Sequence, residues 1–491
     1  MSMKLGGIVS GLDTNDLISK IMQVERQPMT LIKNRKHTYE LKKDLWTEIN
    51  TSLLALKTSN DKLLDVNSFK KRTATTSNDA VVTATASDAA AEATYNVTVT
   101  NLAQNHQIRG DQKAAGWTAG AAGAEGSFTI SDNLYTSTIN VNAADTLQTI
   151  ADKINAAKDN TDTTKSLRVT ASVVDNTLVL SHDEKGSTST ISFTAPSTVL
   201  DNIGLVNAGT TTIKNLIQGA EDATFTVNNI NVTRTRNDNL TDVISGLTLN
   251  LKDENKSATI TVKKDVDSAY NTVKEFIDKY NSTMDLINAK LSEKKVKEPI
   301  SDFDRKKGLL RGDSVLAGVK SRLRMDISDP VAGLPSAYDR LSVIGITTTS
   351  GDFGKSGRLQ IDETKFKEAL SANPDLVIQL FTNNADTDTD GTIEFAEKGV
   401  AQRVSDELKN LTDSATRSVA GVTVKNGTIL SKIDSIDKII NGYDDQLTAF
   451  EERLKLREKA LWSQFTALET SLSTLNNQAS WLAGQLMGLN Q

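Results

Sequence analysis

The fold follows from residues 433–486, which read IDSIDKIINGYDDQLTAFEERLKLREKALWSQFTALETSLSTLNNQASWLAGQL. Apolar residues recur there at alternating steps of three and four, which places them in a narrow stripe on one side of a helix. A continuous helix of this length is roughly 80 Å long at 1.5 Å per residue, more than one compact domain uses. We expect one long helix, or two nearly collinear ones, that needs a partner helix; the edge of an ordinary helical bundle is the alternative. The stripe consists of Ile433, Ile436, Ile440, Tyr443, Leu447, Phe450, Leu454, Leu461, Phe465, Leu468, Leu472, Leu475, Ala479, Leu482 and Leu486.

Two features interrupt this stripe. Arg457 and Gln464 fall where apolar side chains are expected, and the four-residue step from Leu461 to Phe465 shifts the register. Gly442 is a second weak point, because Gly inside a helix costs about 1 kcal/mol relative to Ala. These are the positions where two collinear helices are expected to meet.

The N-terminal region also predicts amphipathic helices. Residues 6–13 are too glycine-rich for regular structure, and Asp13 or Thr14 can cap the helix that follows. Pro28 interrupts this helix or starts a second one, which runs to about Leu64. Both ends of the chain therefore carry apolar stripes, and we expect them to pack together with the rest of the chain looped out between them. The first helix has the stripe Leu17, Ile18, Ile21 and Val24, and the second has Leu31, Leu41, Leu45, Ile49, Leu53, Leu56 and Leu63.

The middle of the chain, residues 73–262, is rich in Thr, Asn, Ser and Ala and shows period-two alternation with β-branched residues, which is typical of strands. One amphipathic helix interrupts it at residues 147–157. We predict an outer β domain formed by residues 73–107 and 220–262, with an inner β-rich domain, residues 108–219, inserted in it. Two sequential β domains are the alternative.

The fold class is therefore α+β and multidomain, with long coiled-coil-like helices at both ends and β-rich domains inserted between them. Residues 1–40 and 435–491 are the predicted terminal leg helices. Residues 41–72 and 263–434 form a mainly helical domain, in which we expect one or two strands around 341–346 and 359–361.

Composition excludes several classes of function. The chain has 491 residues, no cysteine and a net charge of −6, which argues against disulfides, thiolate chemistry and nucleic-acid binding. No apolar run is long enough for membrane insertion, and the opening residues do not resemble a cleavable signal peptide. The three histidines, His37, His106 and His182, are scattered, and no nucleophile or phosphate-binding motif is present. We expect no enzyme activity and no cofactor.

A calcium-loop pattern is the sharpest motif. Residues 386–397 read DTDTDGTIEFAE and fit the twelve-residue loop, with Gly391 at the sharp turn. The alternative is a solvated acidic turn, because such loops usually work in pairs and the chain has no second one. The ligands that the motif predicts are Asp386, Asp388, Asp390, the carbonyl of Thr392, Glu394 and Glu397.

Several segments resemble the bacterial flagellar filament cap family, also called hook-associated protein 2. The opening GIVSGLDT (7–14) with VERQP (24–28) is similar to that family's N-terminus, and QFTALE (464–469) to its C-terminal half. The other similar segments are ATYNVTVTNLAQ (93–104), DTLQTIADKIN (145–155) and residues 341–381 with Gly345, Gly357, Leu359, Asp362 and Pro374.

The resemblance implies a structural cap at the distal end of the flagellar filament, which promotes folding and insertion of exported flagellin and prevents its leakage. It implies an extracellular location, flagellar type III export without a cleaved signal peptide, and a ring homo-oligomer. The implied partners are flagellin, hook–filament junction proteins and an export chaperone. A secreted adhesin that binds host surface ligands through its β domains, on a coiled-coil stalk, is the alternative. We place the filament contacts, or contacts that only hold the protomer together, on Leu17, Ile21, Val24, Phe465, Leu468, Leu472, Leu475 and Leu482.

Overall fold

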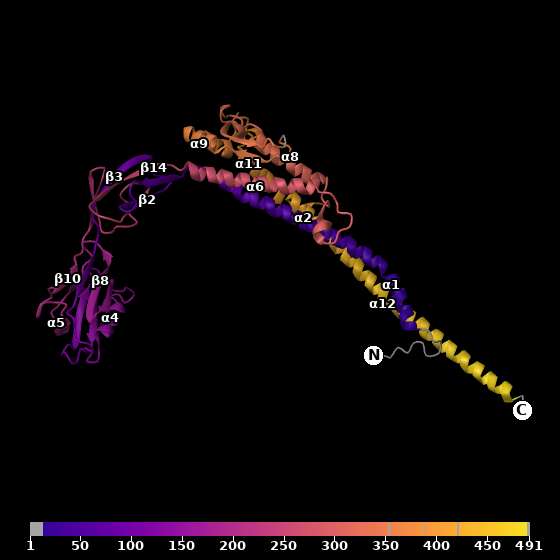
Figure 1. The fold of residues 1–491 in the computed structure, drawn as a ribbon, viewed down its shortest axis with the longest axis horizontal. Helices are drawn as coiled ribbons and strands as arrows, with labels where there is room; N and C mark the ends of the chain where they lie inside the picture. The colour runs from indigo at the N-terminus through magenta and orange to yellow at the C-terminus, as the bar shows by residue number, and fades with distance from the viewer. Residues whose placement is uncertain (1–12, 352–353, 388, 420–421, 489–491) are drawn as a thin grey trace. The chain divides into compact units, whose positions relative to one another are not determined.

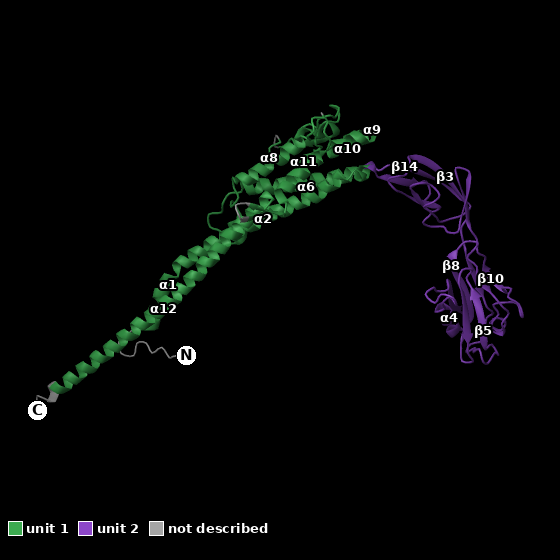
Figure 2. Cartoon of the chain, turned by 180° about the vertical axis from the view of Figure 1, so that it is seen from behind, with its two compact units in different colours: residues 1–69, 267–491 green, residues 70–266 purple. Residues whose placement is uncertain are grey.

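The chain folds into two compact units, residues 1–69 with 267–491 and residues 70–266 (Figure 2). Long helices come from both ends of the sequence and the β-rich region lies between them in the chain, which confirms the predicted α+β fold class. No helix in the described part of the chain is long and apolar enough to cross a bilayer. The computed structural model describes the whole sequence except residues 1–12, 352–353, 388, 420–421 and 489–491.

The first unit is built around helix α2 (Gln27–Leu64). Helix α6 (Val266–Ser292) contacts α2. The hydroxyl of Thr283 on α6 lies 2.8 Å from the hydroxyl of Ser52 on α2. Helices α11 (Val400–Thr412) and α12 (Thr428–Gly488) also lie beside α2 (Figure 1). The buried side of α2 consists of Met29, Leu41, Leu45, Trp46, Ile49, Leu53, Leu56, Ser59, Asn60 and Leu63.

One residue of the predicted stripe on α2 is exposed. Leu31 is 62% exposed, whereas Leu41 is buried. Helix periodicity does not explain this exposure, because Leu31 and the buried Ile49 are 18 residues apart, which is five whole turns at 3.6 residues per turn, and so share a face of α2. The prediction that Leu31 is buried with the rest of the stripe was wrong.

Shorter elements complete this unit, and one of them corrects the prediction of a strand at 341–346. That segment begins as the 3₁₀ helix η1 (Leu341–Ile344), and Gly345 ends it at φ 93°, a left-handed conformation that glycine adopts without strain. Only then does strand β15 (Ile346–Thr348) begin, which pairs with β16 (Leu359–Ile361). Strand β16 confirms the strand predicted at 359–361. The remaining elements are α3 (Asn67–Lys70), α7 (Asp302–Lys306), α8 (Ser314–Ser328), α9 (Glu363–Ala372), α10 (Pro374–Thr382), the 3₁₀ helix η2 (Phe395–Glu397) and the hairpin β17 (Thr416–Val419) and β18 (Val422–Lys425).

The second unit contains two separate hydrophobic clusters. The first lies in a five-stranded antiparallel sheet of order β1-β14-β3-β11-β12, next to the pair β2–β13. Alternate residues of its strands, such as Val97 and Val99, point into this cluster and are fully buried. The strands are β1 (Arg72–Thr76), β2 (Val82–Ala86), β3 (Ala93–Asn101), β11 (Ala223–Val227), β12 (Ile230–Arg234), β13 (Leu247–Leu251) and β14 (Lys256–Lys264).

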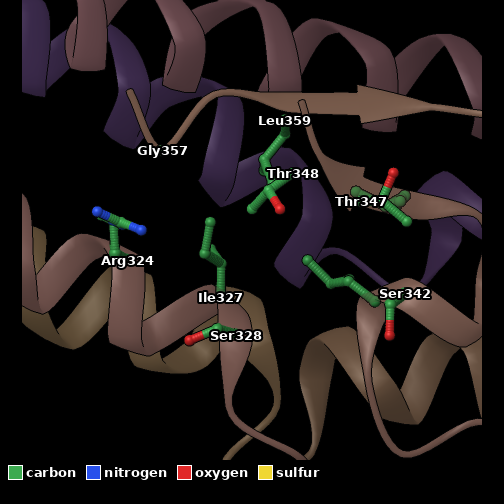
Figure 3. A pocket seen from close by; sticks show the side chains of 10 residues that line it. Arg324, Ile327, Ser328, Ser342, Thr347, Thr348, Gly357 and Leu359 are labelled. Atoms are coloured by element: carbon green, nitrogen blue, oxygen red, sulfur yellow. The ribbon is translucent and has the colours of Figure 1, made fainter. Parts of the chain in front are cut away.

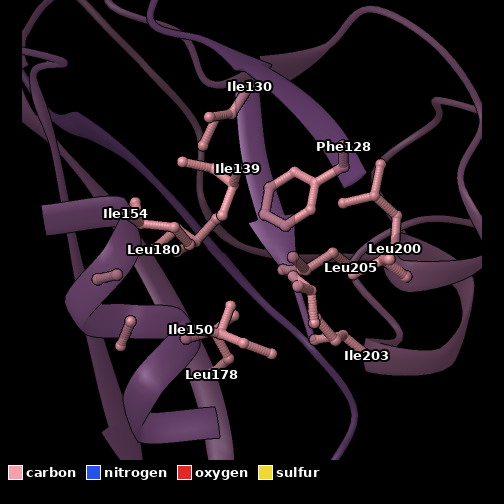
Figure 4. Close-up of a cluster of buried hydrophobic side chains, with 14 of the residues drawn as sticks. Phe128, Ile130, Ile139, Ile150, Ile154, Leu178, Leu180, Leu200, Ile203 and Leu205 are labelled. Carbon is pink, nitrogen blue, oxygen red and sulfur yellow. The ribbon is translucent and has the colours of Figure 1, made fainter. Parts of the chain in front are cut away.

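The second cluster draws its residues from 108–206. Helix α4 (Leu147–Asn155) points Ile150 and Ile154 toward Leu178 and Leu180 of the neighbouring strand (Figure 4). The insertion of one β domain in the other stays a prediction. The other elements around this cluster are β4 (Asn105–Arg109), β5 (Gly126–Ser131), β6 (Thr136–Val141), β7 (Val169–Val174), β8 (Thr177–Lys185), β9 (Ser192–Phe193), α5 (Thr198–Ile203) and β10 (Asn215–Gln218).

Candidate interaction surface on the terminal helices

Helix α1 (Thr14–Glu25) begins at Asp13, whose carboxylate accepts a hydrogen bond from the Asp16 amide at 3.0 Å. Arg26 keeps helical angles, φ −81° and ψ −15°, so the chain passes from α1 into α2 without a loop. Pro28 lies in the first turn of α2, where its missing N–H removes no helical hydrogen bond. The local sequence thus makes α1 an extension of α2.

Helix α12 is continuous over 61 residues and runs antiparallel to α2 and α1 (Figure 1). Lys43 Nζ lies 2.7 Å from Asp437 and Lys36 Nζ lies 2.6 Å from Asp444. Lys43 and Lys36 are seven residues apart on α2, and their partners Asp437 and Asp444 are seven residues apart on α12 in the opposite order. The two helices therefore keep a constant antiparallel register. Continued to Thr14, this register ends near residue 466 of α12.

A small hydrophobic cluster joins the terminal helices. Its buried members come from α1, the start of α2 and α12, and the indole and phenyl rings of α12 pack at its edge. Burial of a large apolar side chain contributes about 1.5–3 kcal/mol, so this cluster is the main attraction between α1 and α12. The buried members are Ile18, Met22, Met29, Leu454 and Leu461, and the partly buried ones are Ile21, Leu447, Phe450, Trp462 and Phe465.

The structure separates the predicted contact residues into two groups. Ile21 and Phe465 pack against this cluster, whereas Leu17 and Val24 are exposed on the outer side of α1. Leu472 is partly buried. Beyond residue 466, Leu468, Leu475 and Leu482 are 49%, 59% and 56% exposed. Among the described residues, few side chains therefore pack against this last part of the α12 stripe.

Sequence reasoning missed some residues of this surface. Met22 and Met29 form its buried centre, although neither entered the predicted contact set. The spacing of four between Ile18 and Met22 is the signal that indicates their shared face. Trp481 is 66% exposed beside Leu482, and its ring adds a large apolar area to the uncovered end of α12.

The acidic loop 386–397 uses several of its carboxylates to hold its own backbone. Asp386 accepts from the amides of Thr389 and Gly391 at 2.6 and 2.8 Å. Glu397 accepts from the amide and hydroxyl of Thr387, both at 2.6 Å, and these bonds hold its pKa down, at about 2. Asp390 accepts from the amide and hydroxyl of Thr392, whose hydroxyl also contacts Glu394.

Asp388, a predicted calcium ligand, lies outside the described residues. Among the residues that are described, no group of three or more histidine, aspartate or glutamate side chains is arranged to hold a metal ion. Calcium would have to replace the loop's own N–H donors on Asp386 and Glu397. Calcium binding stays a prediction.

The first unit also contains a pocket of about 330 Å³ between α8 and the hairpin β15–β16 (Figure 3). Ile327 of α8 points into it from one side and Leu359 of β16 borders the other. Arg324 borders it too, but its guanidinium donates to the Gly354 carbonyl at 3.1 Å. The lining is mostly apolar and carries no group of reactive side chains.

Comparison with protein families gives two matches that together cover most of the chain. Residues 10–106 match the family model described as flagellar hook-associated protein 2 N-terminus. Residues 220–477, more than half of the chain, match flagellar hook-associated protein 2 C-terminus.

Individual relatives agree with these matches. An A-type flagellar hook-associated protein 2 of Pseudomonas aeruginosa is 26% identical, over 99% of this chain and 98% of that protein. The Escherichia coli K12 flagellar hook-associated protein 2 is 25% identical, over 98% and 97%. A Thermotoga maritima relative is 30% identical, but over only 43% of this chain and 32% of that protein.

The fold is shared with a solved structure. It is the crystal structure of the D1-D2-D3 domains of the flagellar cap protein FliD from Escherichia coli, with a TM-score of 0.57 and 23% identity. The match covers 80% of this chain and 99% of that one. At this identity the likeness concerns the fold alone.

Proposed function

Because this chain belongs to the flagellar hook-associated protein 2 family, the filament cap proteins of the bacterial flagellum, we propose that it caps the distal end of the filament, promotes folding and insertion of exported flagellin, and prevents its leakage. The role is structural, and no reaction or cofactor enters it. The protein acts outside the cell, at the flagellum tip.

The observation that supports this proposal is the uncovered end of the α12 stripe. Leu468, Leu475 and Leu482 keep the spacing that buries Leu454 and Leu461 against α1, but no described residue of the same chain covers them to that extent. An apolar stripe of this kind is the surface that a partner helix fills. We propose that helical segments of the filament supply this partner.

We propose further partners on the family relationship. Copies of the chain form a ring, and flagellin and the hook–filament junction proteins meet its terminal helices. An export chaperone accompanies it before type III export, which uses no cleaved signal peptide. No observation favours the secreted adhesin or a host surface ligand.

Complementation tests the proposal. A motile bacterium that lacks its own cap gene is given this chain, and filament length and flagellin in the medium are measured by electron microscopy and immunoblotting. We expect restored filaments and no leakage. Continued leakage, with the chain detected outside the cell, would contradict the proposed cap function in that filament.

The role of the stripe is tested by Leu472→Asp and Leu475→Asp in the same assay. Both should abolish capping and leave the second unit folded. Leu456→Asp is the matched control, because Leu456 is 69% exposed on the same helix but lies about 100° around it from Leu475. Full filaments with Leu475→Asp would refute the assignment of the stripe.

A further inference from the structure

His37 of α2 lies between two carboxylates. Its Nε2 atom is 2.8 Å from Oδ1 of Asp302, at the start of α7, and its Nδ1 atom is 3.4 Å from Oε2 of Glu40, one turn along α2. A neutral imidazole has one N–H donor and one acceptor nitrogen, whereas an ionised carboxylate only accepts. Both contacts are therefore satisfied together only when His37 is protonated.

The surroundings of His37 favour this protonated form. The hydrogen bond to Asp302 raises the pKa of His37 above its ordinary value near 6.5, partial burial works against it, and Glu40 adds to the rise. The competing charges are cationic. Arg305 of α7 lies 3.7 Å from Asp302, and Lys306 also acts on the charge of Asp302. Lys36 lies 3.5 Å from Glu40, and Lys295 lines the same cavity as His37. One further carboxylate, Asp304 of α7, lines this cavity and favours the protonated ring.

Asp302 anchors a connecting segment, residues 293–307, that leaves the end of α6 and crosses to α2. Lys306 pairs with Asp44 at 3.0 Å and forms its second ionic contact with α2. A cavity of about 290 Å³ separates the segment from Asn34, Thr38 and Leu41 of α2. The segment leaves two large apolar side chains in solvent, Ile300 at 93% and Phe303 at 71% exposure.

His37, to which Asp302 is bound, lies in the part of α2 that contacts α12. Lys36, next to His37, pairs with Asp444 at 2.6 Å, and the rings of Tyr39 and Tyr443 are 5.9 Å apart. The connecting segment therefore contacts α2 next to the contacts that hold the paired terminal helices together.

We propose that residues 293–307 form a pH-released clamp, attached to α2 while His37 is protonated and loosened when His37 is neutral. The clamp is closed at a pH below the ordinary pKa of histidine. It is lost as the pH rises through the raised pKa of His37. The role of the clamp rests on the proposed function. Its release frees residues 293–307 next to the paired terminal helices, and these helices must move when flagellin subunits insert.

Histidine titration by NMR in the full chain is the first test, and it is simple because there are three histidines. We expect the His37 ring to titrate above pH 6.5, and Asp302→Asn to lower that midpoint. Glu40→Gln should lower it by less. A His37 midpoint at or below 6.5, or no change with Asp302→Asn, would overturn the clamp.

Hydrogen exchange measures the release itself. Between pH 5.5 and 8.5, after correction for intrinsic exchange, protection of residues 293–307 should fall about two- to fivefold, as expected for a solvent-accessible ion pair. His37→Gln should remove this pH dependence, and His106→Gln, in the other unit, should keep it. Equal protection at both pH values would contradict the proposal. No filament is needed for either measurement, so a failure here is distinguishable from a failure to cap.

Discussion

The side-chain Nε of Arg457 on α12 lies 3.5 Å from a carboxylate oxygen of Glu25, the last residue of α1. The two side chains are 48% and 43% exposed, so the ion pair sits at the rim of the helix pair in contact with water. Exposed pairs contribute about 0.2–1 kcal/mol. Arg457 therefore helps to set the register of α1 against α12 and adds little to the strength of their contact.

We predict that Leu461→Ala and Leu475→Ala differ in their effect on the free protein. Leu461 is 6% exposed in the cluster against α1. Its truncation should lower the free energy of local opening of α1 by about 2 kcal/mol or more. Leu475 is 59% exposed, and its truncation should change stability by less than about 0.5 kcal/mol. Hydrogen exchange of α1 measures both. Equal losses would mean that Leu475 is covered within the protomer.

We predict that acid weakens the second unit through His106. This ring is 7% exposed, and its Nδ1 atom accepts a hydrogen bond from the Ile191 amide at 2.9 Å, which requires an unprotonated nitrogen. Burial lowers the pKa of His106, with a smaller contribution from His182. The folded state therefore binds fewer protons than the unfolded chain, and stability falls as the pH drops below about 6.5.

Thermal unfolding of the second unit between pH 7.5 and 5 tests this dependence. His106→Gln should flatten it, whereas His37→Gln, in the first unit, should leave it unchanged. The same slope with and without His106 would contradict the prediction.

We predict that Asp326→Asn stabilises the first unit at alkaline pH. Asp326 is 4% exposed on α8 and its Oδ2 atom has no hydrogen-bond partner. Burial raises its pKa to about 7, Glu407 adds to the rise, and Arg403 and Arg322 oppose it. The Asp326 carboxyl ionises at a lower pH in the unfolded chain than in the folded one. The free energy of unfolding of the first unit therefore declines as the pH rises from about 4 to 7.

Denaturant unfolding at pH 5 and pH 8 tests this effect. The gain from Asp326→Asn at pH 8 should reach up to about 4 kcal/mol, since each unit of pKa shift corresponds to about 1.36 kcal/mol. At pH 5 the gain should be much smaller. A variant less stable than the parent at pH 8 would show that the carboxylate is compensated in the fold.

The calcium hypothesis predicts heat when millimolar calcium is titrated into the full chain in a calorimeter. Asp386→Asn with Asp390→Asn should abolish that heat, because both carboxylates belong to the predicted ligand set. Magnesium is the control cation, since it is smaller and demands octahedral geometry. No heat with calcium would end the hypothesis.

The spacing of apolar residues was sufficient to predict the partner of the C-terminal helix, but not the extent of their pairing. Leu461 and Leu475 occupy equivalent positions of the same stripe, yet the first is buried and the second exposed. The difference arises from where α1 begins, and periodicity on α12 carries no information about it. Leu31 shares a face of α2 with the buried Ile49 and is nevertheless exposed, so the stripe alone does not predict which of its residues are covered.

Some short elements were predicted, such as the strand at 359–361, and others were not. Residues 341–344 are β-branched or apolar enough to suggest a strand, but Gly345 ends them as a 3₁₀ turn. The pairing of β17 with β18 was missed, although residues 416–419 and 422–425 both contain the β-branched residues that favour strands. The ion pair of His37 with Asp302 joins residues far apart in sequence, and no local pattern indicates it.

The difference in length between α1 and α12 also limits how strongly a partner can be held. Residues 467–485 extend past the register of Thr14 and span roughly 28 Å at 1.5 Å per residue. A covering helix thus needs about five turns and finds few large anchors on the stripe, Leu468, Leu475 and Leu482. At about 1.5–3 kcal/mol each, before the cost of ordering both partners, such a contact is short-lived. Durable attachment then requires several chains to bind at once, so that one can detach and rebind while the others hold.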